Sequence, residues 1–398
     1  MCFVFTGLLM FLESISSDAV KLLDDMRGQQ DRLLDLLKDL VELESPSHDK
    51  VAVDRCVDRV EKECTRIGGR MRRHRRKGFG DLLEVRFGRG GRGVKPMMLL
   101  GHLDTVWELG TLKRMPFKVE KGRIWGPGVL DMKAGVVMAL AAVEHLLEAK
   151  RLERQVILLL VSDEEIGSTA SRPLTEKLAQ ECEAVYVLEP AQGLAGAYKT
   201  ARKGVGQYTV HVEGVAAHSG VDFENGHSAI AELAWQVGVI EGFTELRRGI
   251  TVNVGTIEGG TRSNVVAAKA RAEVDVRIAK AADEARVDYR FRKLRVRDER
   301  CVLTVEGGVN RPPMERTRET ARLFRQAATL AEAMGFDLQE AATGGGSDGN
   351  FTAALGVPTL DGMGAVGEGA HAVHESVVLK ELAPRTALLA AMLLKPEG

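Results

Sequence analysis

PMMLLGHLDTV (residues 96–106) is the stretch that decides the fold, because an unbroken apolar run ends in a histidine and an aspartate. QVILLLVSDEEIGS (155–168) and AVYVLEP (184–190) repeat this pattern, and each run ends in acidic residues. Short apolar runs of this kind are typical of strands buried on both faces. In open α/β sheets, ligands bind outside the carboxyl ends of the strands. The runs therefore predict one sheet edge that carries imidazole and carboxylate groups, namely His102, Glu164, Glu165 and Glu189.

The sequence around these runs fits an α/β domain. Strand and helix patterns alternate between residues 96 and 190, and MKAGVVMALAAVEHLLEA (132–149) has the pattern of a strong helix. Helical spacing also covers residues 18–42 and 50–67. Because strands that alternate with helices form βαβ units, we predict an α/β domain with a mainly parallel sheet.

The pattern changes after Lys203. QYTVHVEG (207–214) alternates with period two, as an antiparallel strand with one exposed face does. A helix, two strands, a charged helix and a last strand follow, at 227–243, 251–260, 268–278, 282–296 and 301–308. This β-α-β-β-α-β order predicts a ferredoxin-like α+β insert. The predicted division is 1–204 and 314–398 for the α/β domain, and 205–313 for the insert.

Composition excludes several classes of protein. A chain of 398 residues is long enough for two domains. Its net charge of -1 gives no reason to expect a nucleic-acid or membrane partner. The five cysteines are scattered and form no CxxC pair, so neither a disulfide framework nor a thiolate zinc site is indicated. A reducing compartment, the cytoplasm, is the simpler expectation.

Two segments have more than one interpretation. The basic run RMRRHRRKGFG (70–80) has little aromatic interleaving, which favours a solvated strand or hairpin over a nucleic-acid site. The apolar segment CFVFTGLLMFL (2–12) is too short to span a bilayer and lacks a basic flank. We interpret it as an upstream extension or a docking helix, with a signal peptide or weak anchor as the alternative.

HLDTV and GPGVLDMKAG each offer a candidate ligand. His102 and Asp104 lie two residues apart, so both side chains face one way on an extended segment. The pair suits a metal ligand and a carboxylate that holds its imidazole, although a structural histidine is the alternative. Asp131 lies just before the predicted helix, where an aspartate can instead serve as a helix cap.

Three later motifs add acidic and imidazole groups. In SDEEIGS, one of the two adjacent glutamates can bind metal while its neighbour acts as a general base, although a solvated acidic turn is the alternative. Glu189 in VLEP has a surface strand end as its alternative. AHAVHES (370–376) offers His371 and His374 shortly before Glu375, and a lone late histidine is often structural.

TGGGSDGN (343–350) looks like a phosphate cradle but lacks the lysine of a P-loop. Its backbone N–H groups, around Gly345 and Ser347, suit a substrate carboxylate or an oxyanion. A plain flexible turn is the alternative.

Taken together, these motifs resemble a known family. HLDTV, GPGVLDMKAG, SDEEIGS, VLEP, GVAAHSG (214–220), TGGGSDGN and HAVHE occur in that order over roughly residues 20–395. The chain resembles the M20 metallopeptidases, and its pattern is similar to the glutamate carboxypeptidase (carboxypeptidase G2-like) branch. The resemblance implies a zinc-peptidase-like catalytic domain with two Zn²⁺ ions per chain, Co²⁺ or Mn²⁺ being possible substitutes. It also implies that the insert is a dimerisation or lid domain.

The resemblance assigns roles residue by residue. His102 and Glu189 correspond to ligands of one ion, Glu165 and His371 to ligands of the other, and Asp131 to the bridge between them. Glu164 corresponds to the general base, and Asp104 to the carboxylate that orients His102. His374 occupies a position where the family usually has a small polar residue.

The insert and the segment after it supply further implied contacts. His218 in GVAAHSG corresponds to a lid histidine that reaches the active site of the partner subunit in a homodimer. Asn264 in TRSNVVA and Arg311 in NRPP fall where the family contacts substrate. A guanidinium such as that of Arg311 suits a C-terminal carboxylate, because it can donate two parallel hydrogen bonds.

The implied activity is hydrolysis of an amide bond in a small peptide or N-acyl amino acid. A carboxypeptidase that releases a C-terminal amino acid, with glutamate as one candidate, is the leading hypothesis. An N-acyl-amino-acid deacylase performs the same chemistry and leaves the same free carboxylate. A non-catalytic metal-binding scaffold is the third hypothesis. The presence of both Glu164 and every metal ligand argues against it.

Overall fold

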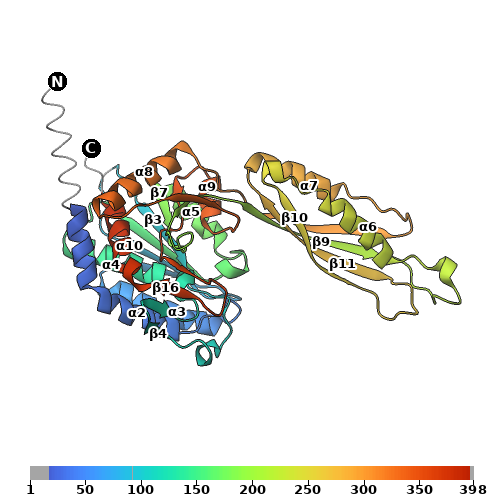
Figure 1. Cartoon of the computed structure of the whole chain (residues 1–398), viewed down its shortest axis with the longest axis horizontal. Coiled ribbons are helices and arrows are strands. Elements are labelled where there is room, and N and C mark those ends of the chain that lie inside the picture. Colours follow the sequence, from blue (N-terminus) through green and yellow to red (C-terminus); the bar gives the residue numbers. More distant parts are fainter. Residues whose placement is uncertain (1–17, 92, 395–398) are drawn as a thin grey trace, which may run out of the picture. The chain divides into compact units, whose positions relative to one another are not determined.

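The computed structural model describes residues 18–91 and 93–394. The apolar segment at residues 2–12 lies outside this part of the chain. The chain forms two compact units (Figure 1). Unit 1 runs to Thr200 and resumes over Arg316–Ala342 and from Ser347 onward, whereas unit 2 comprises Ala201–Glu315 and Thr343–Gly346.

Unit 1 contains a six-stranded sheet. The order is β1 (Arg70–His74), β2 (Leu82–Phe87), β6 (Val156–Val161), β3 (Met97–His102), β7 (Ala184–Val187) and β14 (Thr359–Leu360). The last four strands run parallel to one another. The basic run lies in the antiparallel β1–β2 hairpin at the sheet edge, as the hairpin interpretation expects. The prediction of an α/β domain with a mainly parallel sheet is confirmed.

Helices cover both faces of this sheet. One face packs against α2 (Gln30–Glu42), α3 (Lys50–Arg66), α4 (Ala134–Glu148), α8 (Arg318–Ala333) and α10 (Leu379–Leu393). The other face packs against α5 (Arg172–Glu181), which contacts α9 (Gly349–Ala354). Strand residues alternate between the two layers, so Leu99 lies in the first core and Met98 in the second. Burial of both faces explains why the strands read as continuous apolar runs.

The helices differ slightly from their predicted bounds. The pattern over residues 18–42 is broken at Gln29, which separates a helix over 18–28 from α2. The helix predicted from Met132 begins at Ala134, because Asp131 and Met132 have non-helical backbone angles. In α3, the Asp49 carboxylate accepts a hydrogen bond from the Ala52 N–H at 2.9 Å and so caps the first turn.

Smaller sheets complete unit 1. One has the order β15 (Gly367–Glu368), β16 (Ser376–Val378), β5 (Arg123–Trp125) and β4 (Lys118–Glu120). Another sheet pairs β8 (Tyr198–Arg202) with β13 (Glu340–Thr343). The division between the units falls within both strands, after Thr200 in β8 and after Ala342 in β13. Across the described ranges, no helix combines the length and apolar character needed to span a bilayer.

Unit 2 is a ferredoxin-like α+β domain, as predicted. Its elements are β9 (Gly204–Glu213), α6 (Ala229–Glu241), β10 (Thr251–Gly259), β11 (Lys269–Ile278), α7 (Glu284–Arg292) and β12 (Val302–Arg311). The sheet order is β10-β11-β9-β12, and all neighbours are antiparallel. Both helices lie on one face of the sheet (Figure 1), where they share a core with alternate strand residues. This one-sided burial produces the period-two pattern seen in the sequence.

Candidate metal centre

The carboxyl ends of three neighbouring strands bring acidic and imidazole side chains to one sheet edge. His102 is the last residue of β3, and Glu189 follows β7 by two residues. Glu164 and Glu165 begin a short 3-10 turn after β6. Because β6 and β7 flank β3 in parallel, their carboxyl ends meet at the same rim.

A loop before α4 adds Asp131 to this rim. The loop covers Val129–Lys133 and leads into α4, whose Gly135 packs against the end of β7. A Cβ atom at Gly135 would lie 2.1 Å from the Leu188 carbonyl oxygen, closer than any side chain allows. The glycine of DMKAG therefore permits the contact that sets the loop beside Glu189.

A tight turn between β15 and β16 supplies His371. The Ala372 N–H donates to the Gly369 carbonyl at 2.8 Å, and His371 itself has φ 62, in the left-handed region. Non-glycine residues adopt this region rarely, and such strain gathers at functional sites. The side chain is 51% exposed, against 2% for His102, so the His371 side of the cluster is the side open to solvent.

These residues form two groups that share Asp131. His102, Asp131 and Glu189 place ligand atoms within 4.8 Å of one another, and so do Asp131, Glu165 and His371. Asp131 Oδ1 lies 3.3 Å from His102 Nε2, whereas its Oδ2 lies 3.3 Å from His371 Nε2. The distances from imidazole to the remaining carboxylates are 3.6 Å to Glu189 and 3.2 Å to Glu165. Each oxygen of Asp131 therefore faces a different group.

Several atoms of the cluster lack hydrogen bonds and suit a cation. Within the part of the chain that the structure describes, His102 Nε2, Asp131 Oδ1 and Glu165 Oε1 are buried without a hydrogen-bond partner. Buried polar atoms are rarely left this way unless an ion or water satisfies them. One imidazole and two carboxylates in each group are ligands that zinc accepts. The donor set therefore fits two divalent ions, with Asp131 able to contact both.

The ionisable groups of the cluster shift one another's pKa values. Burial disfavours the imidazolium of His102, but Asp131 and Glu189 outweigh it and hold the pKa of His102 well above its ordinary value. The carboxylates of Asp131 and Glu165 raise the pKa of His371 to about 10. Burial alone would raise the pKa of Asp131, yet the two imidazoles hold it below the ordinary value. Negative charge therefore dominates the cluster, as a cation site requires.

Asp104 connects His102 to the two glutamates. His102 Nδ1 lies 2.9 Å from the Asp104 carbonyl oxygen and 3.6 Å from its carboxylate. That carboxylate is fully buried and accepts hydrogen bonds from the Glu164 N–H, the Glu165 N–H and the Ser47 hydroxyl at 3.3, 3.2 and 2.7 Å. Asp104 therefore fixes the imidazole through its backbone and the glutamate turn through its side chain.

Two further buried groups were not singled out from the sequence. The Glu375 carboxylate accepts hydrogen bonds from the loop that carries Asp131. The Lys133 ammonium donates to the Leu43 carbonyl at 2.9 Å, and burial lowers the pKa of this lysine. The sequence offered one indication of each residue's place at the centre. Glu375 lies close to His371 in HAVHES, and Lys133 lies close to Asp131.

Comparisons with known proteins agree with this geometry. Residues 98–395 match the sequence profile of Peptidase family M20/M25/M40. The chain belongs to this family. The predicted resemblance is thereby confirmed, and the chain is a metal-dependent hydrolase.

The similar proteins include carboxypeptidases and a deacetylase. Carboxypeptidase G2 of Pseudomonas sp. (strain RS-16) is 28% identical over 382 residues, which cover 93% of this chain and 90% of that protein. Acetylornithine deacetylase of Myxococcus xanthus is 29% identical over 276 residues, or 64% of this chain and 68% of that protein. An M20 family metallo-carboxypeptidase from Sulfolobus solfataricus has the same fold, with a TM-score of 0.73, 18% identity, and coverage of 92% of this chain and 99% of that chain.

The remaining predicted residues of this M20 hydrolase lie in both units. His374 is exposed and belongs to neither ligand group. In unit 2, exposed His218 accepts a hydrogen bond from the Gly220 N–H at 3.2 Å, and the Asn264 carbonyl accepts one from the Ser219 N–H at 3.0 Å. The structure therefore brings the segments of His218 and Asn264 side by side.

The TGGGSDGN segment is divided between the units. Gly345 lies in unit 2, where its carbonyl and that of Gly346 accept hydrogen bonds from Arg202 at 3.1 and 3.2 Å. Arg311 is buried, and its side chain lies against Gly346. Ser347 lies in unit 1, and its buried hydroxyl donates to Asp361 at 2.6 Å.

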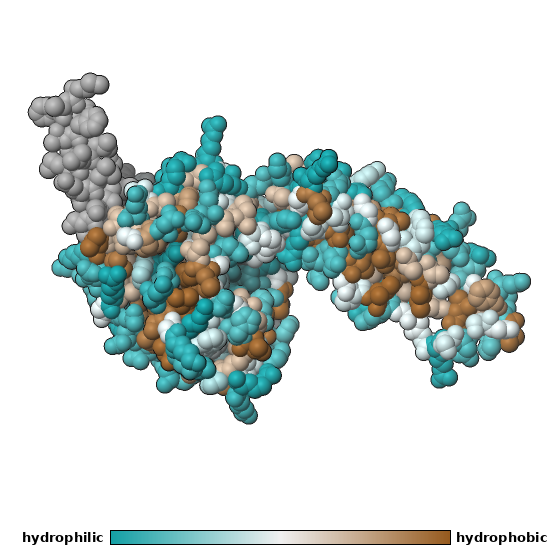
Figure 2. Space-filling model, viewed as in Figure 1, coloured by the Kyte–Doolittle hydropathy of each residue, from teal (hydrophilic) through white to brown (hydrophobic). Residues whose placement is uncertain are grey.

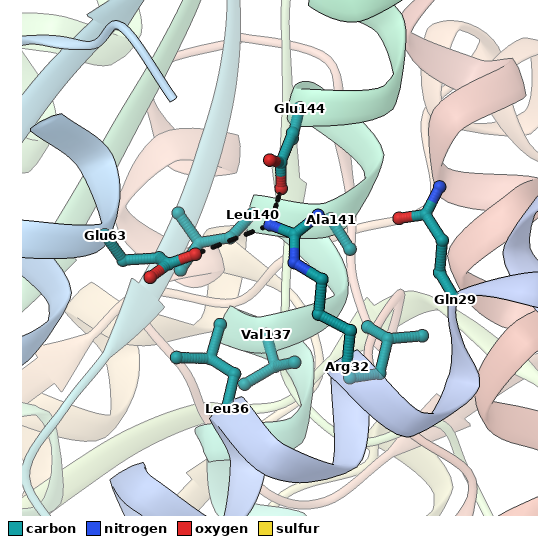
Figure 3. A pocket seen from close by; sticks show the side chains of 9 residues that line it. Gln29, Arg32, Leu36, Glu63, Val137, Leu140, Ala141 and Glu144 are labelled. Carbon is teal, nitrogen blue, oxygen red and sulfur yellow. Dashed lines mark hydrogen bonds and ion pairs between the residues drawn. The ribbon is translucent and has the colours of Figure 1, made fainter. Parts of the chain in front are cut away.

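A second group of buried carboxylates in unit 1 is built differently. Glu63 of α3 and Glu144 of α4 line a small pocket beside α2 (Figure 3). Arg32 forms an ion pair with Glu144 and lies 3.5 Å from Glu63. Arg66 contacts Glu144 at 2.6 Å and Glu63 at 2.7 Å, and Arg59 contacts Glu63 at 3.1 Å. We call Glu63, Glu144 and these three arginines the arginine cluster.

Proposed function

We propose that this chain is a dizinc hydrolase that cleaves an amide bond beside a free carboxylate, as a carboxypeptidase does. The shared position of Asp131 carries the proposal, because its two oxygens face two separate groups of ligand atoms. His102 and Glu189 would hold one ion, and Glu165 and His371 the other. In two-metal sites of this kind, bound ions polarise a carbonyl and make water more acidic.

Glu164 is the residue we assign to proton transfer. It begins the turn after β6 directly beside Glu165 but belongs to neither ligand group. We propose that Glu164 takes a proton from the attacking water and passes it to the leaving amine. Asp104 supports this role, because its carboxylate binds the Glu164 N–H.

The substrate would be a small peptide or an N-acyl amino acid. Carboxypeptidase G2 supports the first, and glutamate is then one candidate for the released residue. Acetylornithine deacetylase supports a deacylase as the second candidate. We assign Arg311 to the free carboxylate of either substrate, and Asn264, Gly345 and Ser347 to further substrate contacts. A non-catalytic scaffold is disfavoured, because the general base and every ligand are present.

Metal content and product identity test this proposal together. The purified chain should bind two zinc ions, and chelation should abolish turnover that added Zn²⁺, Co²⁺ or Mn²⁺ restores. A panel of dipeptides and N-acyl amino acids, each paired with its C-terminal amide, should show turnover only with a free carboxylate. Release of the C-terminal amino acid from peptides identifies a carboxypeptidase, whereas turnover of N-acyl amino acids but not of peptides, giving a carboxylic acid and the free amino acid, identifies a deacylase. A single ion at full activity would contradict the dizinc assignment.

We further propose that the chain forms a homodimer through unit 2. Strand β10 is an edge strand with residues 255–260 exposed, and such an edge can pair with another chain. Apolar side chains are exposed beside it, including Ile230 and Trp235 of α6 and Ile257 of β10. Figure 2 shows apolar surface on this unit in the region of α6. In such a dimer, His218 would act in the partner's active site.

Subunit mixing tests that arrangement. His218→Ala and Glu164→Gln chains would each have strongly reduced activity alone. A heterodimer would contain one site with both defects and one with neither, so mixing should restore up to about half of the activity per dimer. Exchange of subunits without any return of activity would place His218 in its own chain's site or outside catalysis.

Among the residues that the structure describes, four buried cysteines are free: Cys56, Cys64, Cys182 and Cys301. Free thiols are usual in reducing compartments. We therefore propose a cytoplasmic location, which fractionation of cells that express the tagged chain would test.

A further inference from the structure

We propose that Glu375 is a positioning residue that sets the bridging carboxylate of Asp131, and this inference rests on the proposed dizinc centre. Glu375 is 1% exposed and immediately precedes β16. It is not part of either ligand group, so it would act on the metals only through the backbone that carries their ligands.

All four hydrogen bonds of the Glu375 carboxylate go to the surroundings of the centre. Its Oε1 accepts from the N–H groups of Leu130 and Asp131 at 2.9 and 3.1 Å. Its Oε2 accepts from the Gly128 N–H at 2.9 Å and the Trp107 indole N–H at 2.7 Å. A carboxylate offers about four acceptor positions, so this one is fully used.

The donors come from two segments of the metal centre. Leu130 and Asp131 belong to the loop before α4, Gly128 immediately precedes that loop, and Trp107 belongs to the segment after His102. Glu375 also closes the turn that directly follows His371, since its backbone N–H donates to the Ala372 carbonyl at 2.9 Å. One residue therefore contacts the loop of the bridge through its side chain and the turn beside a second ligand through its backbone.

The hydrogen bonds of the Glu375 carboxylate orient the backbone of the metal centre and do more than neutralise charge. Among the described residues, no lysine, arginine or histidine lies within ion-pair distance of Glu375, and all four of its hydrogen bonds come from N–H groups. The nearby Lys133 interacts with this carboxylate only at longer range. Asp131 must present one oxygen to each metal group, which allows the loop little rotation. Groups that hold ligands from outside the coordination sphere typically change metal affinity about 10–100-fold when lost.

The test uses the full chain with Glu375→Gln. An amide keeps the size of the side chain but replaces one acceptor oxygen by an NH₂ group, so two of the four hydrogen bonds become contacts between donors. We expect Zn²⁺ affinity, measured by competition with a chromophoric chelator, to fall about 10–100-fold. The visible absorption of the Co²⁺-loaded variant should also change, because the ligand geometry around cobalt changes.

Two further variants make the result interpretable. Glu375→Asp keeps the charge but is one methylene shorter, so it reaches fewer donors and should give an intermediate loss of affinity. Glu368→Gln is the matched control, because Glu368 lies seven residues away on β15, is about half exposed and pairs with Arg123. It should leave Zn²⁺ affinity and the cobalt spectrum unchanged.

The outcomes separate this inference from the proposed function. If the unaltered chain binds no Zn²⁺, the dizinc proposal itself fails. If the unaltered chain binds two ions, and folded Glu375→Gln or Glu375→Asp binds them with unchanged affinity and spectrum, the positioning role is overturned. A lower melting temperature without those two changes would likewise overturn it, because it would indicate a purely structural residue.

Discussion

Two groups of buried carboxylates in unit 1 differ in what balances their charge. In the arginine cluster, three guanidinium groups surround Glu63 and Glu144. At the metal centre, two imidazoles face three carboxylates from distances of 3.2–3.6 Å. The carboxylates of both groups are at most 14% exposed, so burial alone does not distinguish them.

The difference lies in whether the cation can give up its proton. Arginine stays protonated at any pH a protein tolerates, so the arginine cluster keeps its own counter-charge permanently. Histidine can release a proton when a metal competes for its nitrogen, and metal binding then replaces proton by ion. This difference favours a structural role for the arginine cluster and a metal-binding role for the histidine-bearing group.

The largest expected effect comes from Glu164→Gln at the metal centre. Loss of a general base typically costs on the order of 10²–10⁴ in rate. Because Glu164 belongs to neither ligand group, the variant should keep its metal. Turnover number and elemental analysis on the same preparation check both parts. Loss of metal together with activity would assign Glu164 to the ligands instead.

Glu165→Gln should weaken metal binding, because Glu165 lies with Asp131 and His371 in one ligand group. The affinity should fall by at least about 10–100-fold, the amount typical for losing even an outer partner. Glu63→Gln, the same substitution in the arginine cluster, is the matched control and should not change metal affinity. Equal effects of the two variants on metal binding would remove the proposed distinction between the clusters.

Much of the metal centre could be predicted from the sequence, because local pattern and topology agree there. Apolar runs that end in His102, Glu165 and Glu189 predict parallel strands, and parallel strands share a carboxyl edge. Asp131 and His371 needed the family resemblance, since neither follows a buried run and each has a common structural alternative. The helix after Asp131 begins two residues later than predicted, because the loop's backbone angles are not visible in side-chain periodicity.

The role of Glu375 and the arginine cluster could not be predicted in the same way. Glu375 binds backbone N–H groups of residues about 245 positions away, and backbone groups carry no sequence signature. Glu63 lies on α3 and Glu144 on α4. Nothing in the sequence around either glutamate distinguishes it from a glutamate on the exposed face of a helix. Helical spacing along α3 places Arg59 and Arg66 beside Glu63, but only tertiary packing brings Arg32 of α2 and Glu144 of α4 to them.

A smaller effect is expected from Glu144→Gln in the arginine cluster. Arg32 and Arg66 are each nearly half exposed and can regain water, so the loss should be about 1–2 kcal/mol. This corresponds to a lower melting temperature by about 2–4 °C per kcal/mol. Glu148→Gln, one turn along α4 at an exposed position, should have no such effect. Metal stoichiometry should stay at two, and a loss of metal would show that the two clusters are coupled.

The smallest expected effect concerns pH. Burial would raise the pKa of Glu63, but Arg66 and Arg59 outweigh it and hold that pKa below its usual value. A glutamate in the unfolded chain has a pKa of about 4.3. The stabilisation from the charged Glu63 is therefore complete above that pH, and it is lost as the pH falls through the lower pKa of the folded state.

Melting temperatures of the unaltered chain and Glu63→Gln from pH 7 to pH 3 test this sign. Both should be measured without metal, because acid also protonates the histidine ligands and would release the ions. The variant should melt below the unaltered chain near neutral pH, and the difference should shrink as the pH falls below about 4. A difference that stays constant over the whole range would mean that Glu63 acts through packing alone. In that case, fixed guanidinium charge would not be what distinguishes the arginine cluster from the metal centre.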